Sequence, residues 1–187
     1  MNIVRNTVSF AMKIAEEYIN EGDICIDATA GKGSDTERLC TLAGEKGHVY
    51  AFDIQKKALD ITEKRLEEKG FRNFTLIHDG HENMSSYVKD EVSAVIFNLG
   101  YLPEGDKNIT TAPWTTMKGI GEALDIIKCD GIVVIVMYQG HEEGKKEKEK
   151  ILSWAEELDK SIYHCAYVSM INQKNDPPEI LFITKKK

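Results

Sequence analysis

The chain has 187 residues, of which 42% are hydrophobic, 8% aromatic and 29% charged, so a disordered chain is excluded and a single domain over residues 1–187 is expected. The formal net charge is −7, which excludes nucleic-acid binding by overall charge and leaves only a local basic patch for it. No apolar run approaches the roughly 20 residues of a membrane span, and acidic residues interrupt the N-terminal segment where a signal peptide needs an apolar core. We therefore expect a cytoplasmic protein.

Short β-branched runs alternate along the chain with amphipathic helical stretches. The expected helices are 4–20, 36–43, 55–69, 115–128 and 142–158, and the expected strands are 23–29, 47–52, 74–77, 92–97, 131–138, 163–170 and 179–184. This alternation predicts an α/β fold with a mostly parallel sheet between helices, whose ligands bind beyond the carboxyl ends of the strands. The last two strands have no helix between them, which predicts a hairpin and an antiparallel edge. The N-terminal helix is apolar enough to pack on this sheet or on a second subunit of a homodimer.

The four cysteines are isolated, with no C-x-x-C pair and no histidine at ligand spacing. They are Cys25, Cys40, Cys129 and Cys165. This pattern disfavours a zinc site or a disulfide framework and predicts buried free thiols, so no metal is expected.

A glycine-rich turn, Gly31-Lys32-Gly33-Ser34-Asp35-Thr36, follows the first strand and opens a helix, as nucleotide-binding segments do. It is not a P-loop, because Ile26 stands where the first glycine is required and Gly33 where a hydroxyl residue is required. It also departs from the dinucleotide pattern, since Thr36 replaces the third glycine. NAD-dependent oxidoreduction is therefore the weaker alternative.

Acidic residues end three consecutive strands: Asp27, Asp53 and Asp79. Asp53 lies 22 residues beyond Gly31, close to the roughly 20-residue spacing at which a carboxylate meets ribose hydroxyls. Asp27 stands directly before the turn, where its charge disfavours a phosphate and favours a cationic ligand. S-adenosyl-L-methionine carries a ribose, a sulfonium and an ammonium but no phosphate, so we expect this cofactor.

These motifs together resemble class I methyltransferases and, more narrowly, the small single-domain YtqB/MnmM family. The residues that carry the resemblance are the run from Asp27 to Thr36, Asp53, Asp79-Gly80-His81 and Asn98-Leu99-Gly100-Tyr101-Leu102-Pro103. The family was long labelled as rRNA methylases, and its members are understood as tRNA wobble-uridine methyltransferases. The resemblance covers essentially the whole chain. It implies a Rossmann-like fold, S-adenosyl-L-homocysteine as the product of the cofactor, and methylation of 5-aminomethyl-2-thiouridine in the anticodon region of tRNA.

The resemblance also implies roles for individual residues. Asp27, Gly31, Gly33 and Asp35 would lie along the methionine part of the cofactor, Asp53 and Gln55 at its ribose, and Asp79-Gly80-His81 at its adenine. Thr29, Ser34, Thr36 and Asn98 complete the expected cofactor-binding set.

The fourth strand ends in a motif that bears on the methyl acceptor. Enzymes that methylate amino nitrogens often carry N/D-P-P-Y/F here, so that a side-chain oxygen and a backbone carbonyl bind the amine. Asn98 and Tyr101 match this pattern, while Leu99 and Gly100 replace the prolines, which keeps an amine acceptor and disfavours a flat base amine. An aliphatic amine is mostly protonated at neutral pH, and Asp106 and His141 are the expected proton acceptors.

Three readings of the function stay open besides the tRNA enzyme: an rRNA methyltransferase, a small-molecule methyltransferase, and a module that binds S-adenosylmethionine without turnover. The charged segment 142–150 alternates in sign and predicts a solvated helix face. The expected RNA contacts are Lys107, Lys118, Lys174 and the tail Lys185–Lys187.

Overall fold

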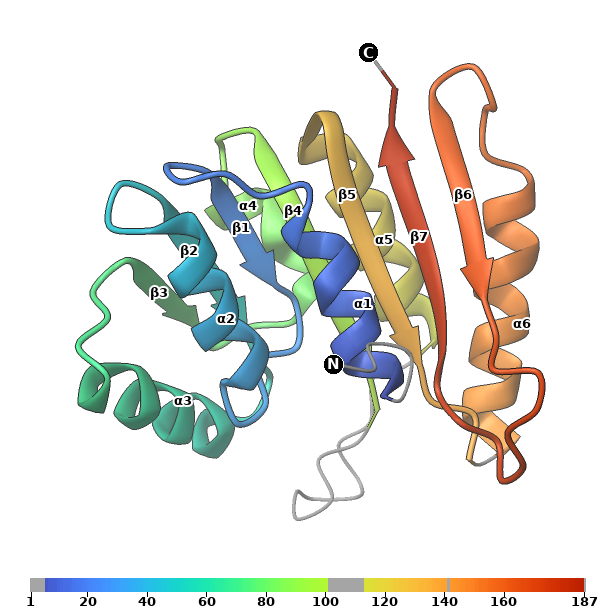
Figure 1. The fold of residues 1–187 in the computed structure, drawn as a ribbon, viewed down its shortest axis with the longest axis horizontal. Coiled ribbons are helices and arrows are strands. Elements are labelled where there is room, and N and C mark those ends of the chain that lie inside the picture. The colour runs from blue at the N-terminus through green and yellow to red at the C-terminus, as the bar shows by residue number, and fades with distance from the viewer. Residues whose placement is uncertain (1–5, 101–112, 141, 187) are drawn as a thin grey trace.

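In the computed structural model, seven strands form one mixed sheet in the order β3-β2-β1-β4-β5-β7-β6 (Figure 1). The structure describes residues 6–100, 113–140 and 142–186. The strands are β1 Ile24–Asp27, β2 His48–Phe52, β3 Phe74–Ile77, β4 Val92–Leu99, β5 Ile127–Met137, β6 Tyr163–Val168 and β7 Glu179–Lys185. Strands β1 to β5 run parallel, so the mostly parallel α/β fold is confirmed. The order of strands reverses between β1 and β4, which is where such sheets bind ligands.

Helices cover both faces of the sheet, and each face has its own hydrophobic core (Figure 1). The helices are α1 Thr7–Glu16, α2 Ser34–Ala43, α3 Lys56–Glu68, the 3-10 turn η2 His81–Asn83, α4 Met84–Tyr87, α5 Pro113–Ile126 and α6 Glu142–Glu156. Side chains of α1, α2 and α3 pack on one face, and those of α4, α5 and α6 on the other. In α1, Ala11, Met12 and Ala15 are buried against β5 and β7. The N-terminal helix therefore packs on its own sheet.

The last two strands form the predicted antiparallel hairpin at one edge of the sheet, and the last strand is the inner member of the pair. β7 lies between β5 and β6 and pairs antiparallel with both, so β6 is the edge strand and runs parallel to β5. The hairpin expectation is therefore confirmed for the pair β6–β7. Adjacency along the chain specifies that two strands pair; it does not specify which of them reaches the rest of the sheet.

Several element boundaries also differ from expectation. β4 continues two residues further than predicted and includes Asn98. β5 begins at Ile127, four residues early, and its start departs from regular pairing near Asp130, whose φ is +58°. The short helices η2 and α4 were not predicted, because the segment 81–87 is too short to show helical periodicity.

The cysteines are free thiols, as predicted, but two of them are not buried. Cys25 and Cys40 lie in the core, and burial raises the pKa of each to about 12. Cys129 and Cys165 are exposed, at the start of β5 and on the edge strand β6. The described residues contain no helix long and apolar enough to cross a bilayer, and no group of three potential metal-ligating side chains.

Candidate functional site

The glycine-rich turn joins β1 to α2 at the carboxyl edge of the sheet. Gly31 and Gly33 have φ of +53° and +77°, a conformation that favours glycine, and Gly33 forms the N-cap of α2. Beneath the turn, the fully buried Asp27 carboxylate accepts hydrogen bonds from the Thr36 hydroxyl at 2.6 Å and the Thr29 N–H at 3.1 Å. Burial and the charge of nearby Asp35 raise the pKa of Asp27. The environment of this carboxylate therefore favours a nearby cation.

Side chains from β2 and α3 hold the turn from the other side. Asp53 accepts the Gly31 N–H at 2.9 Å and the Gln55 N–H at 2.8 Å, which ties the turn to the end of β2. The Thr62 hydroxyl donates to the Gly31 carbonyl at 3.1 Å. A Cβ built at Gly33 would lie 2.8 Å from the Thr62 methyl carbon, so α3 packs directly against the turn.

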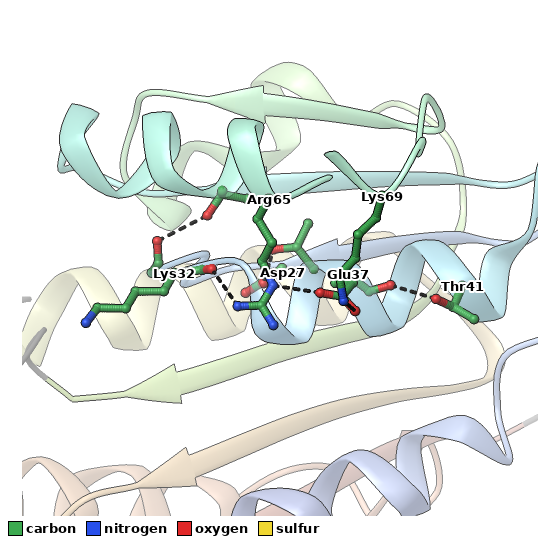
Figure 2. Close-up of polar contacts among 9 residues, drawn as sticks. Asp27, Lys32, Glu37, Thr41, Arg65 and Lys69 are labelled. Atoms are coloured by element: carbon green, nitrogen blue, oxygen red, sulfur yellow. Dashed lines mark hydrogen bonds and ion pairs between the residues drawn. The ribbon is translucent and has the colours of Figure 1, made fainter. Parts of the chain in front are cut away.

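Figure 2 shows how α3 is in turn fixed to α2. The Glu37 carboxylate binds Arg65 Nε and Lys69 Nζ, each at 2.6 Å, and these two cations together with hydrogen bonding hold its pKa low. Arg65 also reaches the Lys32 carbonyl at 3.5 Å. Arg65 is therefore half-buried and engaged with the turn.

The third acidic residue, Asp79, is held by its own segment. Its carboxylate accepts the Gly80 N–H, the Asn83 amide at 3.0 Å and the Tyr87 hydroxyl at 2.8 Å. His81 is buried, stacks edge-on to Phe97 at 5.3 Å between ring centroids, and approaches the Ala28 carbonyl with Nδ1 at 3.2 Å. Burial lowers the pKa of His81, so the ring is neutral and Nδ1–H donates to that carbonyl.

Asn98 connects the end of β4 to the glycine-rich turn. Its backbone N–H donates to the Thr29 hydroxyl at 2.8 Å, and its side-chain Nδ2 donates to the Asp35 carboxylate at 3.2 Å. The amide oxygen Oδ1 is buried and has no hydrogen-bond partner among the described residues. A buried acceptor without a partner is costly, so this oxygen is available to a donor on a ligand.

Tyr138, directly after β5, is a site residue that the sequence analysis did not single out. A Cβ built at Gly100 would lie 3.3 Å from the Tyr138 ring, which places the ring beside the end of β4. Burial and the negative charge of Asp35 raise the pKa of the Tyr138 phenol, so the two side chains are within electrostatic reach. Its position at the end of β5, on the same edge as the other motifs, was the signal that could have found it.

The structure brings all of the expected cofactor-binding residues to one edge of the sheet. They are Asp27, Thr29, Gly31, Gly33, Ser34, Asp35, Thr36, Asp53, Gln55, Asp79, Gly80, His81 and Asn98. Tyr101, Asp106 and His141 lie outside the described residues, as do Lys107 and Lys187. Because β7 runs antiparallel, Lys185 and Lys186 lie at the opposite edge, where Lys185 Nζ donates to the Ile127 carbonyl at 3.0 Å. These two lysines are therefore wrong as contacts for a substrate at the site.

Known proteins are similar to the chain over nearly its whole length. A sequence model of the family described as "Putative rRNA methylase" matches residues 49–184. The chain belongs to this family. This membership confirms the family resemblance and makes the chain an S-adenosylmethionine-dependent methyltransferase.

One relative of this chain is the chloroplastic tRNA (mnm(5)s(2)U34)-methyltransferase of Arabidopsis thaliana. It is 33% identical over 97% of the chain and 70% of its own length. A solved structure described as an rRNA-methylase from Clostridium thermocellum is 40% identical, with a TM-score of 0.94 over 97% of this chain and 98% of that one. A second, from Streptococcus mutans, is described as "a putative methyltransferase" in complex with SAH. It is 35% identical, with a TM-score of 0.89 over the same shares.

Proposed function

We propose that this enzyme methylates the terminal amine of 5-aminomethyl-2-thiouridine at the wobble position of tRNA, as a single methyltransferase domain over residues 1–187. The observation that carries the proposal is the 33% identity, over 97% of the chain, to a tRNA (mnm(5)s(2)U34)-methyltransferase. The site supports it independently, because the buried, unpartnered Oδ1 of Asn98 is an acceptor suited to an amine N–H.

We further propose that S-adenosyl-L-methionine lies across the carboxyl ends of β1, β2 and β3. Its methionine part would lie along the turn from Asp27 to Asp35, its ribose at Asp53 and Gln55, and its adenine at Asp79-Gly80-His81. The charge of the site supports this fit: burial raises the pKa of Asp27 and of Asp35, and a sulfonium or ammonium nearby would offset the cost of ionising them. When bound, this cofactor supplies an electrophilic methyl group on sulfur.

The protein's part in such a reaction is mainly positioning, because methyl transfer is an in-line displacement whose rate depends on orientation. Asn98 is held at both its backbone and its side chain, by Thr29 and Asp35. That double anchorage suits a group that orients the lone pair of an amine. The anticodon region of tRNA is the proposed partner. Of the expected lysines, Lys174 is exposed in the loop before β7, whereas Lys118 contacts Asn83 and Glu122.

The test uses purified protein, labelled S-adenosylmethionine, and total tRNA and rRNA from cells that lack the gene, followed by nucleoside analysis. We expect label in 5-methylaminomethyl-2-thiouridine from tRNA alone. Label in rRNA would contradict the tRNA assignment and favour the reaction suggested by the family description. Cofactor binding without label in either RNA would favour a small-molecule substrate or a binding module.

A further inference from the structure

We propose that Asp35 is the proton acceptor for the substrate amine, in addition to lying beside the cofactor. The inference rests on the proposed function, because only an amine that arrives as an ammonium ion needs to lose a proton before it can attack. Sequence analysis assigned Asp35 to cofactor binding alone.

The position of Asp35 carries the inference. Its carboxylate Oδ2 accepts a hydrogen bond from Asn98 Nδ2 at 3.2 Å, so it lies next to the amide whose other atom, Oδ1, is buried without a partner. A donor nitrogen bound at Oδ1 of this amide would therefore approach the Asp35 carboxylate. Tyr138 lies within electrostatic reach of the same carboxylate and beside Gly100, at the end of β4.

Among the described residues, the three other aspartates of the expected site already accept hydrogen bonds from the protein. Asp27 is fully buried beneath the turn and bound by Thr36 and Thr29. Both oxygens of Asp53 accept backbone N–H groups. Asp79 lies on the far side of the site, beyond β1 and β2, and is held by Tyr87 and Asn83. Within the described part of the chain, Asp35 is the carboxylate hydrogen-bonded to the Asn98 amide, which is expected to bind the acceptor.

The charged groups around Asp35 set its proton affinity. Burial raises its pKa, while the Asn98 hydrogen bond and the charge of Arg38 on α2 lower it, with the net effect upward. Asp27 on β1 and the phenol of Tyr138, directly after β5, also interact electrostatically with Asp35. A carboxylate with a raised pKa is a stronger base than an exposed one, which suits a general base.

The substrate ammonium gives one proton to an oxygen of the ionised Asp35, leaving a neutral amine. The nitrogen lone pair then forms the bond to the methyl carbon while the carbon–sulfur bond breaks and its electron pair stays on sulfur. The product is a secondary ammonium, and the proton on Asp35 leaves to solvent before the next turnover.

The decisive experiment compares the wild-type enzyme with Asp35→Asn, which keeps the shape of the side chain. We expect the kcat at saturating cofactor to fall by about 100-fold or more, and the Kd for SAH to rise by a much smaller factor, because Asp35 is also proposed to lie beside the cofactor. The deficit should shrink as the pH is raised from 6 to 9, because a substrate amine that is already neutral needs no base. Asp35→Glu, which restores a carboxylate, should recover part of the lost kcat.

Two controls make the outcome specific. Asp60→Asn alters an exposed carboxylate on α3 paired with Lys56, and should leave kcat and its pH profile unchanged. Thermal melting of each variant, with and without SAH, checks that it folds. The role of Asp35 as proton acceptor would be overturned if Asp35→Asn lost the same fraction of kcat at every pH. It would also be overturned if the variant only raised the KM for the cofactor. A wild-type enzyme that labels no RNA would instead overturn the proposed function, and this inference with it.

Discussion

Gly33 combines two constraints at one residue: a φ of +77° and close contact with Thr62 on α3. We expect Gly33→Ala to lower the free energy of unfolding by roughly 2–3 kcal/mol, because an alanine there is strained and its Cβ meets the Thr62 side chain. The displaced turn should also weaken SAH binding by about tenfold. Urea unfolding and calorimetric titration measure the two effects.

Gly22 provides the matched control, since its φ is +96° but a Cβ built there meets nothing within 4 Å. Gly22→Ala should therefore cost only the backbone strain, about 1 kcal/mol, and leave SAH binding unchanged. Equal costs for the two variants would show that the contact with Thr62 does not constrain the turn.

At the scale of elements, a buried ion pair joins α6 to β7. Lys148 Nζ lies 3.0 Å from Glu179 Oε2 and donates to Gln139 Oε1 at 2.6 Å, while Gln139 donates to the Pro177 carbonyl at 3.1 Å. The loop after β5 and the loop before β7 are thus tied together at the same edge as the site. The charged segment 142–150 was predicted to be a solvated face; Lys148 and Glu147, which accepts a hydrogen bond from the hydroxyl of buried Thr116 at 2.7 Å, depart from that prediction.

Lys148→Met should lower the free energy of unfolding by about 2–3 kcal/mol, because it leaves the Glu179 carboxylate buried without its cation. Burial acts to raise the pKa of Glu179, but the bonds from Tyr167, Ser169 and Lys148 outweigh it and the net shift is downward. The stabilisation is therefore present above the ordinary pKa of a glutamate and is lost as the pH falls through the lowered pKa. Unfolding curves between pH 3 and 7 should show a weaker acid dependence in the variant.

Lys145→Met is the natural comparison, because Lys145 lies on the same helix and pairs at 3.0 Å with Asp176, which is exposed. Screening by solvent makes such a pair weak, so this variant should unfold with wild-type stability. A similar loss in both variants would mean that the length of the side chain on α6, and not the buried charge, is what matters.

For the molecule as a whole, the buried carboxylates of the site make stability depend on pH with a sign opposite to that of Glu179. Burial raises the pKa values of Asp27 and Asp35 in the folded protein, so the folded state holds protons that the unfolded chain releases. Without ligand, this lowers stability as the pH rises from about 4, the ordinary range of aspartate, through the raised values. Asp27→Asn should therefore stabilise the ligand-free protein at pH 8 by roughly 1–2 kcal/mol and have little effect near pH 4.

The same variant should bind S-adenosylmethionine more weakly, because it lacks the charge that favours the cation. Melting temperatures of wild type and Asp27→Asn at pH 5 and pH 8, each with and without S-adenosylmethionine, test both effects. A variant destabilised equally at both pH values would show that the hydrogen bonds to Thr36 and Thr29 outweigh the cost of the charge.

Periodicity and turn motifs were sufficient to predict the seven strands, the five longer helices and the edge of the sheet at which the candidate site residues gather. They could not predict that Asn98 Nδ2 contacts Asp35, since these residues are 63 positions apart and meet only through the pairing of β1 with β4. The contacts of α3 with the turn could not be predicted for a similar reason, because Thr62 and Arg65 have the pattern of ordinary residues in an amphipathic helix. Local patterns report which side chains face a core, whereas these contacts depend on how two helices are placed on the sheet.

The insertion of β7 between β5 and β6 has a consequence for the order in which the protein can fold. Strands β1 to β5 can pair as soon as β5 has left the ribosome, but β6 then has no neighbour to bond with, because its only partner in the sheet is β7. The strand that joins β6 to the rest is made after all the others. Until residues 179–185 emerge, β5 remains an unpaired, strongly apolar edge strand in the nascent chain. During that interval β5 is most exposed to pairing with another chain.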